Sequence, residues 1–417
     1  MQRVSWSSWV RKIVSKDLGS GSGILWVAGA ALLVTLAKLF VSWCAIGTND
    51  AVYCIIFAEV LHKAGPVQIY SLVSYYNHPP LMSWFLTAVS FAQARTGWPF
   101  PFLFRLAPIL ADVGSVFVIW SLLQRRRHPH ALALTLICCL NPVNFLISAY
   151  HGNTDPVFIF FILLAVFFAE PRRAFWAGLI LGLSMCVKIV PVIFVPFFFF
   201  WLQGRRDRAV FSAGALIFPL IVFVPFFILA PAPFFHNVFQ YSSLKGLWGI
   251  GHFFLEAFAA AGLLKQAPHV VVAFFRRLVP VVLSVFFIAN TAFSWKVAGR
   301  RRLDLLEGLF VITAFFLVLT PGFGVQYLSW LACFAILNAP VLGTAWVILA
   351  GVFLLRVYAF WGGLIPPYYA NSDLVGPWRG PDRLFDLALW VFLIVLLVSF
   401  LRKRGLSTLE QVLSDGT

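Results

Sequence analysis

Residues 24–44 read ILWVAGAALLVTLAKLFVSWC, and this stretch decides the fold class. A helix of about 20 consecutive apolar residues spans the hydrocarbon core of a bilayer. Comparable runs follow at 101–123, 131–149, 209–230, 270–295, 341–360 and 384–401. The sequence therefore predicts a chain that crosses a membrane many times.

The composition supports the same fold class. Of the 417 residues, 61% are hydrophobic, 17% are aromatic and only 11% are charged. So few polar groups cannot coat a soluble globule of this size. We expect an all-α polytopic membrane protein, with a transmembrane bundle and interfacial helices in its first outer loop.

Basic residues gather in short clusters between the apolar runs. The chain carries 31 Lys and Arg against 15 Asp and Glu, a formal net charge of +16. The clusters lie at 3–16, 125–127, 172–173, 205–208, 296–302 and 402–404. Because cytoplasmic loops are enriched in Lys and Arg, we place all clusters and both termini in the cytoplasm. The excess charge then reflects topology and attraction to anionic lipids, and no nucleic-acid partner is expected.

The spacing of these clusters predicts about 12 crossings (11–13), because each intervening segment must cross out and back. The stretch 174–203 then makes two short passes around Lys188. The runs 79–95 and 250–264 fit poorly as crossings, so we expect them to be interfacial or re-entrant.

In this topology, polar residues gather on the extracytoplasmic face, beginning with the first outer loop. Asn49 and Asp50 directly follow the first span, and residues 51–63 read as an amphipathic interfacial helix. His78 precedes two prolines, which the first turn of a helix tolerates because it has no backbone donor to lose. We expect any active site to open on this face.

Several motifs, in this order, resemble the polytopic glycosyltransferases of the GT-C superfamily, which take sugar from a polyprenyl-phosphate donor. They are TND at 48–50, YNHPPL at 76–81, FLFRLAPILADVGSVFVIW at 102–120, NPVNFLISAYHGNTDP at 141–156, GLSMCVKIVPVIFVP at 182–196 and GVQYLSW at 324–330. The similarity extends to protein O-mannosyltransferases, lipid-linked-oligosaccharide glucosyltransferases and GPI mannosyltransferases. It divides the chain into a GT-C-like module, 1–210, containing the outer loop 45–80, and a variable transmembrane module, 211–417, with outer loops 231–252 and 361–383.

The resemblance implies sugar transfer to a hydroxyl, which needs a base for the acceptor proton and positive charge near the departing phosphate. One carboxylate then suffices and predicts inversion, whereas retention would need a second carboxylate as nucleophile. We expect Asp50 to be the base; the alternative is a solvated loop acid or a helix N-cap. Asp155 is expected as partner acid or metal ligand, or as the cap of the helix beginning at Pro156.

The expected donor contacts come from cations and amides. Lys188 is a lone cation in an apolar stretch, so it meets an anion such as the donor phosphate or snorkels to water. Arg105 lies seven residues before Asp112, on the same helical face, so an internal ion pair and a phosphate contact are equally expected. His78 binds a phosphate or holds the first loop to the bundle.

Further residues are expected to line the substrate groove: Asn49, His151, Tyr241, Lys245, Gln326 and Tyr327. Interfacial tyrosine also serves as an ordinary membrane anchor. A divalent metal is a lesser possibility, since imidazole and carboxylate groups suit it. Its candidate ligands, which match no standard spacing, are His151, His236, His252, Glu59 and His62.

The sequence thus predicts an inverting, polyprenyl-phosphate-dependent hexosyltransferase of cell-envelope glycan biosynthesis, with mannose favoured. The expected acceptor is a hydroxyl of a lipid, glycan or protein on the extracytoplasmic face. The alternative is a flippase or transporter of lipid-linked sugar, which would place polar residues through the membrane depth.

Overall fold

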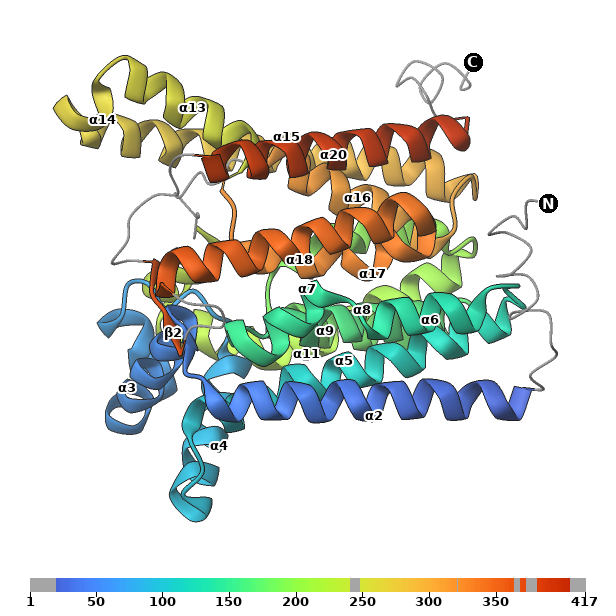
Figure 1. Ribbon diagram of the computed structural model, residues 1–417, viewed down its shortest axis with the longest axis horizontal. Coiled ribbons are helices and arrows are strands. Elements are labelled where there is room, and N and C mark those ends of the chain that lie inside the picture. Colours follow the sequence, from blue (N-terminus) through green and yellow to red (C-terminus); the bar gives the residue numbers. More distant parts are fainter. Residues whose placement is uncertain (1–19, 241–247, 321, 364–367, 373–380, 406–417) are drawn as a thin grey trace, which may run out of the picture.

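The computed structural model describes residues 20–240, 248–320, 322–363, 368–372 and 381–405. This part of the chain is almost entirely helical and contains one pair of two-residue strands, β1 (Gly47–Thr48) and β2 (Tyr369–Ala370). Seven helical stretches are long and apolar enough to cross a membrane. The predicted all-α polytopic fold class is confirmed (Figure 1).

The seven long stretches coincide with the seven apolar runs of the sequence, because hydropathy and length are local properties. They are α2 (Ser20–Cys44), α5 (Phe100–Arg125), α6 (Ala131–Cys139) with α7 (Pro142–Leu146) and η1 (Ile147–His151), α11 (Arg205–Leu229), α15 (Pro268–Gly299), α18 (Pro340–Gly362) and α20 (Pro381–Lys403).

Shorter apolar helices fill the bundle between the long ones. They are α8 (Asp155–Ala169), α9 (Ala174–Val187), η2 (Val190–Phe194) with α10 (Val195–Trp201), α16 (Leu305–Leu319), and η3 (Val325–Tyr327) with α17 (Leu328–Asn338). Two short helical segments flank Lys188, α9 and η2 with α10, and their crossing of the membrane stays a prediction. The total of about 12 crossings stays a prediction.

The bundle has two chemically different ends. Figure 1 shows the beginning of α2 and the end of α20 at the same end of the molecule. The basic turns at 125–127, 172–173 and 300–302 belong to this arginine-rich end. The opposite end carries β1 and β2 together with α3 (Asn49–Leu72) and α4 (Pro80–Thr96).

The helices of this opposite end differ from the bundle helices in direction. Helix α3 bends at Gly65 (φ 82°), next to Pro66. Helix α4 starts at Pro80 and runs across the bundle axis (Figure 1), so its expected interfacial placement fits its direction. Helices α13 (Gly249–Ala260) and α14 (Leu263–Gln266) also lie at this end of the bundle (Figure 1). Helix α12 (Pro231–Phe239) contacts α3, where Asn237 donates to the Tyr70 carbonyl. Aromatic rings of α3, α11 and α12 form a second core, in which Tyr70 contacts Phe226 and Phe234.

Helices α9 and α11 pack with their backbones in close contact. A Cβ on Gly178 would lie 2.0 Å from the Phe211 carbonyl oxygen, and one on Gly182 would lie 2.5 Å from that of Ala215. Two small residues four apart let membrane helices approach this closely, with van der Waals contact in place of a hydrophobic driving force.

Ion pairs hold the arginine-rich end together. Arg126, after α5, binds Glu170, after α8, and reaches Asp304 at 2.8 Å before α16. Asp304 also caps α16 in a reciprocal box with Glu307, which in turn binds Arg404 of the α20 end. Segments far apart in sequence are thereby joined at the membrane surface.

Candidate active site

A buried arginine fixes the backbone that leads to Asp50. The Arg105 guanidinium on α5 is fully buried and donates only to carbonyl groups. These carbonyls lie at the end of α2 and just beyond it, in Ser42, Ala45 and Ile46. They are the acceptors that a helix end leaves without partners. Arg105 therefore positions the chain that enters the site.

The two halves of the chain meet at the short parallel strand pair. Gly47 pairs with Tyr369 and Thr48 with Ala370. Gly47 has a φ of 94°, and a Cβ there would lie 2.1 Å from the Tyr150 carbonyl oxygen, so only glycine fits. Next to the strand, the Ser372 hydroxyl donates to the Asn49 side chain at 3.1 Å. The loop after α18 thus fixes the first turn of α3, which carries Asp50.

Asp50 has one carboxylate oxygen held by the protein and one available. Its Oδ2 accepts from Asn153 Nδ2 at 2.9 Å and lies 3.1 Å from His151 Nε2. No described residue hydrogen-bonds to Oδ1, and the side chain is 33% exposed. The free oxygen is therefore available to an external donor.

His151 lies between Asp50 and Tyr358, a residue that was not among those expected in the site. The π-helical turn η1 ends at His151, and the Thr48 hydroxyl donates to the His151 carbonyl at 2.8 Å. The His151 Nδ1 lies 3.0 Å from the Tyr358 hydroxyl on α18. Both ring nitrogens are thus engaged within the protein, and the residue is 3% exposed. This arrangement orients Asp50, and the expected substrate contact of His151 stays a prediction.

Asp155 begins α8 and has both carboxylate oxygens engaged. Its Oδ1 binds the Lys188 ammonium, and its Oδ2 accepts from Trp330 Nε1 at 2.7 Å. The residue is fully buried. Asp155 therefore holds the Lys188 cation in place, and its role as partner acid or metal ligand stays a prediction.

Lys188 follows α9 directly and remains accessible. Its ammonium lies 5.6 Å from the ring centroids of both Tyr327 and Trp330, and its side chain is 19% exposed. Aromatic faces attract a cation and hold it without hydrogen bonds. The neighbouring Gln326 is half-buried, in the same turn as Tyr327. Lys188 thus presents positive charge at the edge of an aromatic wall.

His78 lies on the loop before α4, within electrostatic reach of Lys188. Its ring packs against Phe57 and Tyr76, at 5.9 and 5.5 Å between centroids. No described residue hydrogen-bonds to the ring, and the Tyr70 hydroxyl donates to the His78 carbonyl at 2.7 Å. Burial, and then the charge of Lys188, lower the His78 pKa to about 4. The imidazole is neutral at physiological pH.

The surroundings of Asp50 favour the charged form of its side chain, whereas those of His78 favour the neutral form. Burial raises the Asp50 pKa, but the hydrogen bond and charge of His151, the bond from Asn153 and the charge of Lys188 outweigh burial and lower it to about 2. Asp50 is therefore ionised throughout the physiological pH range. The charge of Lys188 is the smallest of these contributions, and it indicates that the Asp50 carboxylate and the Lys188 cation lie within electrostatic reach of each other.

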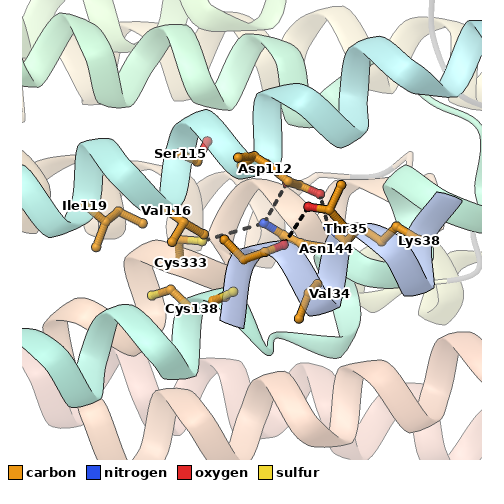
Figure 2. A pocket seen from close by; sticks show the side chains of 13 residues that line it. Val34, Thr35, Lys38, Asp112, Ser115, Val116, Ile119, Cys138, Asn144 and Cys333 are labelled. Atoms are coloured by element: carbon orange, nitrogen blue, oxygen red, sulfur yellow. Dashed lines mark hydrogen bonds and ion pairs between the residues drawn. The ribbon is translucent and has the colours of Figure 1, made fainter. Parts of the chain in front are cut away.

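The expected pair of Arg105 with Asp112 is not formed. Asp112 instead binds the Lys38 ammonium at 2.5 Å and accepts from Asn144 Nδ2 at 3.3 Å (Figure 2). Figure 2 shows Lys38 approaching from α2 and Asn144 from the far side of the same small pocket. Of the two expected roles for Arg105, its carbonyl partners fit the internal one. Lys38 was overlooked, although a lone lysine inside an apolar run signals an internal partner.

Two further groups were predicted from the sequence, namely groove residues and metal ligands. Tyr241 and Lys245 lie outside the described residues. Of the candidate metal ligands, His236 lies 3.0 Å from Gln240, and His151 has the partners given above. The described residues contain no group of three or more His, Cys, Asp or Glu side chains that could hold a metal ion.

The chain also matches the model of a known enzyme family. The family model of glycosyltransferase family 87 matches residues 76–321, more than half of the chain. The chain belongs to glycosyltransferase family 87. The matched range contains His78, Asp155 and Lys188, whereas Asp50 precedes it. The family 87 assignment makes the protein a glycosyltransferase, in agreement with the predicted enzyme class.

Part of the chain is also similar to curated proteins. It is 31% identical over 135 residues to GPI mannosyltransferase 1 of Saccharomyces cerevisiae, and 30% identical over 135 residues to GPI mannosyltransferase 1 of Kluyveromyces lactis. A third relative, GPI mannosyltransferase 1 of Aspergillus oryzae, is 27% identical over 136 residues. The matches cover 32% of this family 87 chain and 31–32% of each relative.

Proposed function

We propose that this protein is an inverting glycosyltransferase that moves a hexose, with mannose favoured, from a polyprenyl-phosphate donor to a hydroxyl acceptor. The observation that carries the proposal is the ionised Asp50 carboxylate, with its free oxygen, coupled to the accessible Lys188 ammonium. A base and a cation are the minimal requirements for this transfer.

In the proposed reaction, the acceptor hydroxyl attacks the anomeric carbon from the face opposite the phosphate. The new bond to the acceptor oxygen forms as the bond between the anomeric carbon and the phosphate oxygen breaks. The hydroxyl proton passes to the free Oδ1 of Asp50, and the departing polyprenyl phosphate keeps the bonding electron pair. Single displacement inverts the configuration at the anomeric carbon. A double displacement would need a second carboxylate as nucleophile, and both carboxylate oxygens of Asp155 are already engaged by Lys188 and Trp330.

Lys188 and its surroundings would receive the donor phosphate. One ammonium hydrogen binds Asp155, which leaves the others for phosphate oxygens. His78 is neutral and carries no internal hydrogen bond among the described residues, so its ring can donate to the same phosphate. Gln326 and Tyr327 border the sugar on the aromatic side. Asp155 keeps Lys188 at this depth.

Mannose is favoured because the relatives that match a third of this chain are named mannosyltransferases. The extracytoplasmic placement of the site is supported by the distribution of basic residues, since the arginine-rich turns lie at the opposite end of the bundle. Mass spectrometry of lipids and glycans from a strain that lacks the gene would identify the sugar and its acceptor.

The substitution Asp50→Asn tests the role of the base. We expect the transfer rate to fall by about 10²- to 10⁴-fold, while binding of the polyprenyl-phosphate sugar persists. Glu59→Gln is the matched control, because it removes an exposed carboxylate from the same helix. Retention of full transfer activity by Asp50→Asn would refute the proposal. A protein that moved lipid-linked sugar across the bilayer without transferring it would favour the flippase alternative.

A further inference from the structure

A second charged site lies at the arginine-rich end, far from the proposed active site. A hollow of about 440 Å³ separates the turn after α8 from the first turns of α9 and α11. Its lining combines cationic side chains with an apolar wall. The lining residues are Arg172, Arg173, Ala174, Phe175, Trp176, Arg206, Asp207 and Val210.

The arginines of this hollow differ from two other arginines of the same end in their contacts with the described residues. Elsewhere at this end, Arg126 binds two carboxylates and Arg208 donates to the Leu202 carbonyl at 2.7 Å. The guanidinium groups of Arg172, Arg173 and Arg206 make no hydrogen bond or ion pair with any described residue. With Asp207 beside them, three positive charges and one negative charge leave a net charge of about +2 at neutral pH. Such a charge suits one or two phosphate groups.

The apolar wall gives the hollow the character of a lipid site. Trp176 is 50% exposed, and Val210 on α11 is 36% exposed beside it. Tryptophan favours the boundary between headgroups and hydrocarbon, where its ring meets acyl chains and its N–H meets water. A soluble anion would use the guanidinium groups but would gain nothing from the exposed indole.

We infer that this hollow binds the headgroup of an anionic phospholipid. The phosphodiester lies among the guanidinium groups of Arg172, Arg173 and Arg206, each of which offers paired N–H donors to phosphate oxygens. The acyl chains leave along Trp176 and Val210 into the bilayer. Basic pockets at the cytoplasmic surface between transmembrane helices bind lipids of this charge. The site is independent of the proposed sugar transfer.

The test compares lipid retention by the purified full chain, using native mass spectrometry in detergent. Phosphatidylglycerol and phosphatidylcholine are the probes. We expect the wild-type protein to retain phosphatidylglycerol and to release phosphatidylcholine. The triple variant Arg172→Gln, Arg173→Gln, Arg206→Gln should bind phosphatidylglycerol at least about tenfold more weakly, since each lost charge-assisted bond carries a measurable share of affinity. The matched control, Arg127→Gln, Arg402→Gln, Lys403→Gln, removes equal charge outside the hollow and should retain the lipid.

A competition arm with the wild-type protein separates a lipid site from a soluble-phosphate site and needs no variant to fold. Glycerol 3-phosphate in large molar excess should leave phosphatidylglycerol bound, because it lacks acyl chains for Trp176. Displacement by this soluble anion would overturn the inference, as would equal retention of phosphatidylcholine. An equal loss of lipid in the control variant would also overturn it, because the charges would then act without the hollow.

Discussion

At the scale of single residues, the candidate site contains a chain of hydrogen bonds from the buried Tyr358 hydroxyl to the partly exposed Asp50 carboxylate. The Tyr358 hydroxyl lies 3.0 Å from His151 Nδ1, and His151 Nε2 lies 3.1 Å from Asp50 Oδ2. Each hydrogen bond restricts the orientation of the next side chain, so the Oδ1 oxygen of Asp50 is held in one orientation. Preorganisation of this kind lowers the reorganisation needed when the acceptor proton moves.

Tyr358→Phe should therefore lower kcat about tenfold, equivalent to ~1.4 kcal/mol, with little change in KM for the donor. The His151 ring would lose its fixed orientation, and Asp50 would follow. Steady-state kinetics on purified protein measure this split. Tyr150→Phe is the control, because the Tyr150 ring lies 4.9 Å from that of Tyr358 but its buried hydroxyl has no partner. Equal effects of the two variants would contradict a positioning role.

His78 makes the stability of the protein depend on pH. Its pKa is about 4 in the folded protein and about 6.5 when exposed, so the unfolded chain binds more protons between these values. Stability from the neutral imidazole is thus complete above pH about 6.5 and is lost as the pH falls toward 4. The melting midpoint in detergent should decline less steeply over this window in His78→Gln than in wild type. Equal slopes for His78→Gln and for the exposed control His62→Gln would argue against this assignment.

At the scale of helices, the closest contact in the bundle is between α9 and α11. Because α9 ends one residue before Lys188, the contact also sets the depth of the cation that Asp155 holds. The glycines at 178 and 182 therefore affect both packing and site geometry. A helix that moved outward by the width of a methyl group would carry Lys188 with it.

Gly178→Ala should lower the melting temperature through a loss of about 1–3 kcal/mol, because the new Cβ would meet the Phe211 carbonyl oxygen at 2.0 Å. Gly29→Ala on α2 is the control, since a Cβ there meets nothing within 4 Å. Thermal unfolding followed by tryptophan fluorescence compares the two variants. An equal melting temperature for both would show that α9 and α11 tolerate separation.

At the scale of the whole molecule, one end is held by ion pairs and the other by loop contacts around the site. Arg126 is the central cation of the first group, with carboxylates from two different turns. Arg126→Gln should destabilise the protein by about 1–3 kcal/mol, because it leaves both carboxylates without their cation. Arg127→Gln, an exposed neighbour, should have little effect in the same thermal assay. A similar loss in both variants would mean that net charge, and not the pairing, stabilises this end.

The sequence predicted local features well and long-range partners poorly. The seven long apolar helices followed from hydropathy, which is contained in a short window of sequence. The grouping of Asp50, His78, Asp155 and Lys188 followed from topology, which placed them on one face. The partner of Asp112 was wrong because Lys38 comes from another helix. Tyr358 was missed because a tyrosine in an apolar helix carries no local sign of its hydrogen bond.

The strand pair β1 and β2 also imposes an order on biogenesis. Gly47 and Thr48 emerge from the ribosome about 320 residues before Tyr369 and Ala370, with which they pair. The nascent chain must therefore insert nearly all of its helices before the first turn of α3, with Asp50, acquires its final support. Until then, the polypeptide can sit in the membrane with the Asp50 carboxylate unaligned, so the proposed active site is completed only among the last events of synthesis.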